Sequence, residues 1–226
     1  MTLARLTLAA LLSLGLVSCS SDGYESGDGK YSYLTADFCL AHTSASQTVD
    51  YVLADDGSKL ALSPKMNLDW AEKADTLYRA LLYYNKNKSG SDNEAVEPVA
   101  AAQVPVLRPV SALLVEKMFT DPLSVESCWL SENRRYVNLT LLLKTGKPDT
   151  DDRTQTVGLV IDSIATSANG VSTAMTRLYH NQGGVPEYYT VRRYVSIDTR
   201  SVKADGITIT ANTYNGLVEK HVSFSH

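Results

Sequence analysis

The chain has 226 residues, of which 44% are hydrophobic and 20% are charged, and its formal net charge is −4. This length and balance are typical of a globular protein with one large or two ordinary domains, and they exclude a disordered chain. Nucleic-acid binding requires clustered Lys and Arg that displace counterions from phosphates, so this mildly acidic chain does not favour a nucleic-acid partner.

Residues 1–18 have the pattern of a secretory signal peptide. Arg5 supplies the positive start, the run from Leu8 to Leu16 is apolar, and small residues precede Cys19. The apolar run is too short to span a bilayer as a mature helix. Leu16-Val17-Ser18-Cys19 resembles the lipobox of bacterial lipoproteins, which implies that Cys19 carries the lipid anchor. An ordinary cleaved signal with an incidental cysteine is the alternative.

Residues 19–30 are expected to be the lipidated cysteine and a flexible tether, because they are rich in Gly, Ser and Asp and offer almost nothing to bury. Asp22, Glu25 and Asp28 resemble an interrupted form of the surface-export signal of Bacteroidetes lipoproteins. A plain solvated spacer is the alternative. We therefore expect an outer-membrane lipoprotein, on the cell surface or on the periplasmic face.

Residues 31–116 are expected to form the first of two β domains. From Tyr31 onward, apolar and polar residues alternate with the period of a strand that buries one face. Asp55-Asp56-Gly57 separates two further strand-like runs and predicts a hairpin, because glycine readily adopts the positive φ of tight turns. The run from Val96 to Val110 holds three prolines, which favours an extended edge segment over a central strand.

Residues 67–85 fit two different structures. Leu68, Ala71 and Ala74 lie near helical spacing behind a candidate cap at Asn67, which favours a helix. The apolar run from Thr76 to Tyr84 fits a buried strand equally well, since periodicity cannot assign so short a run.

Residues 117–226 are expected to form a second β domain with cleaner strand patterns. Short strands separated by turn residues predict a sandwich or a barrel. The final hairpin is predicted at Asn215-Gly216, since both central positions of a type I′ turn need positive φ. The expected strands are 137–143, 157–164, 171–180, 188–197, 207–214 and 218–224.

Several segments besides the lipobox resemble the NigD-like lipoproteins of Bacteroidetes. They are Leu53 to Gly57, Asp121-Pro122 with Ser127-Cys128-Trp129, Leu178 to Asn181, Pro186 to Tyr189, and Tyr194 to Asp198. The resemblance implies an all-β protein with an N-terminal OB-like β-barrel domain followed by an immunoglobulin-like β-sandwich domain, and so a strand at Thr76 to Tyr84. It implies no defined activity and no functional residues, and it leaves any role in bacteriocin biology open.

Chemistry-bearing residues form no recognisable catalytic or metal motif. No Gly-x-Ser-x-Gly nucleophile elbow is present, so we expect no enzyme, no catalytic residues and no cofactor, with a hydrolase as an alternative. No zinc or EF-hand spacing links the candidate ligands, so we expect no metal. These candidates are His42, His180, His221 and His226, and the acidic loop residues Asp149, Asp151 and Asp152. Cys39 and Cys128 are expected to be separate buried thiols, although an exported chain permits a disulfide.

Tyrosine is in excess, with 13 residues against 3 phenylalanines. Amphipathic rings form platforms for sugars or partner proteins, although they also suit half-buried sheet faces. The candidate binding surface is Trp129, Tyr179, Tyr188 and Tyr189. The leading hypothesis is a non-enzymatic, lipid-anchored binding or accessory protein with a protein or glycan partner. The alternative is a glycan-binding surface lipoprotein of a polysaccharide-uptake system.

Overall fold

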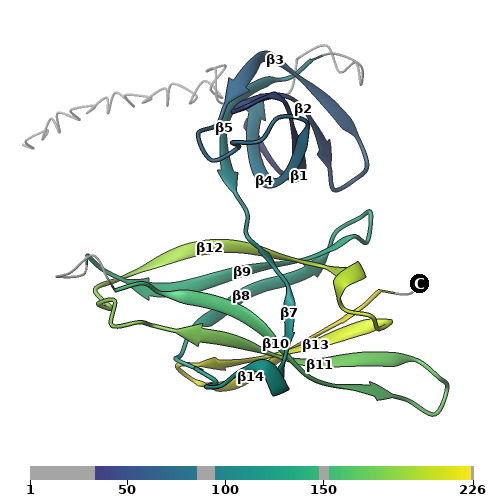
Figure 1. Ribbon diagram of the computed structural model, residues 1–226, viewed down its shortest axis with the longest axis vertical. Helices are drawn as coiled ribbons and strands as arrows, with labels where there is room; N and C mark the ends of the chain where they lie inside the picture. Colours follow the sequence, from purple (N-terminus) through teal and green to yellow (C-terminus); the bar gives the residue numbers. More distant parts are fainter. Residues whose placement is uncertain (1–33, 86–94, 148–152, 225–226) are drawn as a thin grey trace, which may run out of the picture. The chain divides into compact units, whose positions relative to one another are not determined.

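The computed structural model describes residues 34–85, 95–147 and 153–224. These residues form an all-β fold of three sheets with two single-turn 3-10 helices, η1 (Ala112–Leu114) and η2 (Thr199–Ser201) (Figure 1). Over the same residues, no helix has the length and apolarity needed to cross a membrane. The all-β prediction is confirmed.

The first sheet, here called the barrel sheet, has five strands in the order β3-β2-β1-β4-β5. A parallel bridge between Leu62 and Val96 joins the start of β5 to β3, so that the sheet curls back toward its other edge. This order and closure are those of an OB-like barrel, as predicted. The strands are β1 (Leu34–Ala45), β2 (Thr48–Ala54), β3 (Lys59–Asn67), β4 (Thr76–Asn85) and β5 (Glu97–Gln103).

Residues 76–85 form strand β4, in the middle of the barrel sheet between β1 and β5. The helix that propensity favoured over 67–85 is therefore wrong, and the strand implied by the family resemblance is confirmed. Tertiary burial overrides local propensity here, because β4 hydrogen-bonds to a neighbour on each side. Leu68 and Ala71 are buried in the connecting loop, where they pack against the barrel core.

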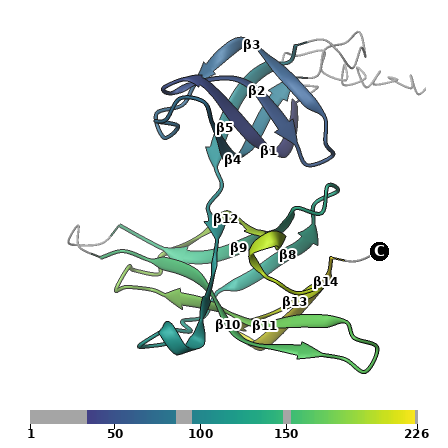
Figure 2. The same ribbon diagram turned by 45° about the vertical axis from the view of Figure 1, so that its right-hand side comes forward.

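The remaining strands form two packed sheets, here called the sandwich. One sheet has the order β6-β12-β9-β8 and the other β14-β13-β11-β10-β7 (Figure 2). Their shared core contains alternate residues of β9, among them Val137, Leu139 and Leu141, as the sequence pattern predicted. The strands are β6 (Val106–Leu107), β7 (Pro109–Ser111), β8 (Ser124–Leu130), β9 (Tyr136–Thr145), β10 (Thr156–Thr166), β11 (Ser172–Asn181), β12 (Tyr189–Asp198), β13 (Gly206–Thr213) and β14 (Gly216–Ser223).

The chain leaves the barrel sheet after Gln103 and pairs with the sandwich from Val106 onward. Strand β6 lies on β12, and β7 then lies on β10 of the facing sheet, so this segment crosses from one sheet to the other (Figure 1). The change of pairing comes ahead of the boundary at residue 117 that composition suggested. Extended proline-containing residues at a sheet edge give little pattern by which to assign them to one sheet.

Candidate functional site

A buried ion pair lies where the barrel sheet meets the sandwich. The guanidinium of Arg79 on β4 donates to both carboxylate oxygens of Asp55, at 2.5 and 2.6 Å. Asp55 lies at the β2–β3 turn, in the Asp-Asp-Gly sequence that predicted the hairpin. The Arg79 side chain is 2% exposed and that of Asp55 is 15% exposed, so the guanidinium is removed from solvent and needs further polar partners to balance the cost of burial.

The sandwich supplies those partners. Arg79 donates to the Oδ1 of Asn138 on β9 at 2.9 Å and to the Oγ of Ser196 on β12 at 3.1 Å. The Asn138 amide donates to Asp55 Oδ2 at 3.1 Å, and Ser196 Oγ donates to Asn138 Oδ1 at 2.7 Å. The guanidinium also lies 4.0 Å from the ring centroid of Tyr136. Because each group has a partner, this network fixes the barrel sheet against β9 and β12.

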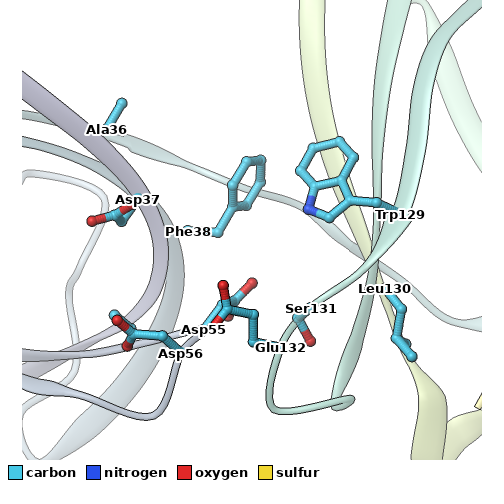
Figure 3. Close-up of a pocket in the computed structure, with 10 residues that line it drawn as sticks. Ala36, Asp37, Phe38, Asp55, Asp56, Trp129, Leu130, Ser131 and Glu132 are labelled. Atoms are coloured by element: carbon cyan, nitrogen blue, oxygen red, sulfur yellow. The ribbon is translucent and has the colours of Figure 1, made fainter. Parts of the chain in front are cut away.

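Beside this network is a pocket of about 360 Å³. Figure 3 shows the rings of Phe38 and Trp129 next to each other, with the carboxylates of Asp55 and Glu132 close by. The Phe38 and Trp129 rings meet edge to face, with centroids 5.4 Å apart, and Phe38 makes the same contact with Tyr194. The lining residues come from β1, the β2–β3 turn, and the end of β8 with its following turn: Ala36, Asp37, Phe38, Ala54, Asp55, Asp56, Trp129, Leu130, Ser131 and Glu132.

The pocket is acidic. Four of its lining residues are Asp or Glu and none is Lys or Arg. Asp37 already accepts the Tyr84 hydroxyl at 2.6 Å, and Asp56 accepts the backbone N–H of Ser58 at 2.7 Å. Glu132 is exposed at the rim. The arrangement therefore presents fixed negative charge beside an aromatic pair, which suits a cationic or a polyhydroxylated group.

The predicted binding residues lie in different places. Trp129, which is 36% exposed, lines the pocket, whereas Tyr188 and Tyr189 are 77% and 58% exposed at the opposite end of the same sheet. Tyr189 pairs with Thr145, and Trp129 pairs with Asn138, seven positions back along β9. Tyr179, on β11 of the facing sheet, packs edge to face against Phe119. The structure thus brings only Trp129 to the pocket.

Several other predicted sites lie partly or wholly outside the described residues. Cys19, the tether, the acidic residues 149, 151 and 152, and His226 lie there. Across the described ranges, no group of three or more His, Cys, Asp or Glu is placed to hold a metal ion. Cys39 and Cys128 are free thiols, as expected. Burial raises the pKa of the Cys39 thiol to about 12 and that of the Cys128 thiol to about 11, so both stay protonated at neutral pH.

The ring nitrogens of the three histidines in the described ranges form hydrogen bonds with carboxylates, a backbone carbonyl and a threonine hydroxyl, and not with a serine or a cysteine. His180 lies near the end of β11, where its Nδ1 meets the backbone carbonyl of Asp121 at 2.8 Å. His42 lies between the carboxylates of Asp50 and Asp75, and His221 meets the hydroxyl of Thr208. Within the described residues these contacts form no serine or cysteine triad, and the absence of enzymatic activity stays a prediction.

Sequence reasoning missed the partners of Trp129. Phe38 is one of many apolar residues in the alternating run that begins at Tyr31, and the sequence predicted only a turn at Asp55-Asp56-Gly57. Arg79 could have been identified from the sequence, because it is the one charged residue in the apolar run from Thr76 to Tyr84. A charge on a buried strand needs a buried partner. Its sandwich partners, Asn138 and Ser196, could not be identified from local sequence.

No family model and no curated protein matches this sequence. The fold, however, is similar to solved structures. One is a NigD-like immunity protein from Bacteroides caccae, with 20% identity and a TM-score of 0.64 over 82% of this chain and 91% of that chain. Another is a protein of unknown function from Bacteroides vulgatus, with 20% identity and a TM-score of 0.61 over 85% of this chain and 90% of that chain. A third is a candidate lipoprotein from Bacteroides fragilis, with 14% identity and a TM-score of 0.58 over 85% of this chain and 98% of that chain.

At these identities the likeness shows a shared fold. It confirms at the level of fold the NigD-like resemblance that the sequence segments suggested. None of these similar structures is described as an enzyme.

Proposed function

We propose that this chain is a lipid-anchored accessory protein of the bacterial envelope that acts by binding a partner protein at the acidic pocket. The single observation that carries the proposal is the aromatic pair Phe38–Trp129 set beside four acidic lining residues, of which Asp55 is bound to an arginine, Arg79, outside the lining. The similarity to an immunity protein and to a candidate lipoprotein supports an accessory role in the envelope.

The pocket favours a basic side chain of the partner. A Lys or Arg head group gains from carboxylates on one side and from an indole face on the other. The Asp55 carboxylate is committed to Arg79, so Glu132 and Asp56 at the rim are the acids best placed to meet an incoming cation. Because such a contact is electrostatic and partly exposed, we expect the complex to weaken as salt is raised.

In-cell photo-crosslinking of the full chain tests this proposal. A photoreactive residue placed at Glu132 is expected to capture a protein, and capture is expected to drop on Trp129→Ala. The control is the same probe at Tyr189, which is exposed at the other end of the sheet and should capture less. Equal capture at both positions, unaffected by Trp129→Ala, would contradict binding at the pocket.

A glycan ligand is the second candidate, favoured by the exposed Trp129 ring and by carboxylates that can accept bonds from sugar hydroxyls. A glycan array separates the two. Binding to an array ligand that is lost on Trp129→Ala and is insensitive to salt favours the glycan, whereas no array binding together with a salt-sensitive protein crosslink favours the protein partner.

The lipid anchor is tested separately by Cys19→Ser. Each methylene buried in the bilayer adds about 0.8 kcal/mol, so a chain that carries several acyl groups stays in the membrane fraction. We expect the wild-type chain in that fraction with labelled fatty acid attached, and the variant without label. A variant that still carries the label would contradict lipidation at Cys19.

A further inference from the structure

A second and larger cavity, of about 700 Å³, opens at one edge of the sandwich, next to the end of β5 and Pro105. Its volume lies within the range of small-molecule sites, roughly 300 to 1,000 Å³. Its apolar wall includes the sandwich core residues Leu107, Leu141, Leu143 and Val195, together with Val157, which packs against that core, and the buried Val185. We call this cavity the sandwich opening.

The opening exists because the crossing segment covers only part of one side of the sandwich. Strand β6 pairs with β12 at Ser196 and Ile197 only, and β7 pairs with β10 from Leu159 to Ile161. Toward its start, β12 has no further strand on that edge within the described residues. The edge of the core is therefore less covered between these parts of β12 and β10, where Val157 is half-buried and Leu141 beneath is 0% exposed.

One arginine lies on the core-facing side of β12 at this opening. Arg193 is paired with Leu141, and its neighbours Val191 and Val195 on the same face pack against the sandwich core. Side chains alternate between faces along a strand, so the Arg193 stem lies on the apolar side and its head group reaches the exposed mouth. Arg193 makes no ion pair with any acidic residue of the described chain.

The charge of the opening is the reverse of that of the acidic pocket. Three arginines line it and no Asp or Glu does. Arg192 is already bound to Glu126 by two hydrogen bonds of 2.7 and 2.6 Å. Arg153 donates to the backbone carbonyl of Gly184 at 3.2 Å and makes no ion pair with an acidic residue of the described ranges, which leave out 148–152. Arg153 and Arg193 therefore offer positive charge at the mouth of an apolar cavity.

We propose that the sandwich opening binds an anionic amphiphile of the fatty-acid class. The alkyl chain lies along the apolar wall of the opening against Leu143, Val157 and Val195, and the carboxylate meets the guanidiniums of Arg193 and Arg153. Apolar burial supplies most of the affinity, and the arginines select the charge of the head group. This site is separate from the acidic pocket, so it stands or fails independently of the proposed function.

The ordinary explanation for Arg193 is that an inward-pointing charge on an incompletely covered strand prevents edge-to-edge association. That explanation requires no ligand. It predicts that Arg193→Gln promotes self-association and leaves amphiphile binding unchanged, whereas a binding site predicts lost affinity.

Calorimetric titration with dodecanoate, below its micelle concentration, tests the proposal. The chain from Ser20 onward suits this experiment because it contains the whole compact unit Tyr33–His226. We expect saturable binding of one dodecanoate, with affinity reduced about tenfold or more for Arg193→Gln, the loss expected for a charge-assisted bond. Dodecanol and dodecyltrimethylammonium should bind more weakly than dodecanoate.

Two variants keep the result interpretable. Arg177→Gln removes an exposed arginine that is paired with Asp162 elsewhere on the sandwich, and it should bind dodecanoate like the wild type. Arg193→Lys keeps the charge and should retain most of the affinity. No binding by the folded wild-type chain, or equal binding by wild type and Arg193→Gln, would overturn the proposal and leave Arg193 as edge protection.

Discussion

Arg79 and Arg193 each lie on a β-strand among apolar neighbours, yet their surroundings differ. Arg79 is enclosed and has a carboxylate, an amide and a hydroxyl as partners. Arg193 is exposed at its tip and has no carboxylate partner in the described chain, although its stem lies on the core face. A buried cation with a full set of partners is structural. A cation at the mouth of an apolar cavity without partners is available to a ligand.

The Arg79→Ala variant tests the structural role of Arg79, and we expect it to have the largest effect on stability. It leaves the largely buried Asp55 carboxylate without its cation, so we expect the free energy of unfolding to fall by about 3 kcal/mol, the lower end of the range for a broken buried pair. Urea denaturation measures the loss. The double variant Arg79→Met with Asp55→Leu, which removes both charges, should recover part of it.

The matched control is Arg177→Ala, because Arg177 makes the same two-bond contact with Asp162 at 2.7 and 2.6 Å. That pair is partly exposed, with 41% and 33% of the two side chains accessible. We expect a loss of less than about 1 kcal/mol, as for surface ion pairs. Equal losses for Arg79→Ala and Arg177→Ala would show that the Arg79 network contributes no more to the free energy of unfolding than a surface ion pair does.

Asn138→Leu addresses the partner on the sandwich side. The substitution keeps a similar volume but removes an acceptor from Arg79 and a donor to Asp55. Leaving buried polar groups unsatisfied costs about 1 to 3 kcal/mol, so the free energy of unfolding should fall by that amount. A variant as stable as the wild type would contradict the role of Asn138, and limited proteolysis between Gln103 and Val106 provides an independent readout.

Arg193→Leu tests the other region. Because Arg193 has no partner to lose, we expect the free energy of unfolding without ligand to change by no more than about 0.5 kcal/mol, in contrast to Arg79→Ala. Denaturation of both variants under one condition measures the difference. A loss of several kcal/mol on Arg193→Leu would mean that this arginine is also a structural residue.

The smallest expected effect concerns pH. The hydrogen bond to Asp50, with a further one to Asp75, holds the pKa of His42 above its ordinary value of 6.5. This contribution to stability is fully present below pH 6.5 and is lost as pH rises through the raised pKa. We expect His42→Gln to lower the free energy of unfolding by less than about 1 kcal/mol at pH 6, and the loss at pH 8.5 to be smaller than the loss at pH 6. A difference that does not depend on pH would contradict this assignment.

The sequence predicted much of the fold because strands and hairpins are encoded by short local patterns, namely alternating apolar residues and turn residues. The alternation at Val137, Leu139 and Leu141 formed as expected, and so did the final hairpin. Its loop residues are Tyr214 and Asn215, however, and of the predicted pair Asn215-Gly216 only Gly216 has positive φ. Residues 67–85 could not be assigned locally, since the burial that selects a strand there comes from β1 and β5. In this segment, helical propensity has a smaller effect than burial in the sheet.

The candidate site was harder to predict because its residues are far apart in sequence. Trp129 was identified as an exposed aromatic, but Arg79 meets Asn138 across 59 positions and Ser196 across 117. Hydrogen bonds between strands of different sheets depend on how those sheets pack, which no periodicity records. A lone charge inside an apolar run indicated that a partner must exist, without indicating which residue it is.

Amide chemical-shift mapping with two probes of opposite charge tests the contrast between the two regions most directly. Our account predicts that a short lysine peptide shifts residues around Asp56, Trp129 and Glu132, and that dodecanoate shifts residues around Leu143, Arg193 and Val195. Shifts at the same residues for both probes, or no shift at the sandwich opening with dodecanoate, would contradict it.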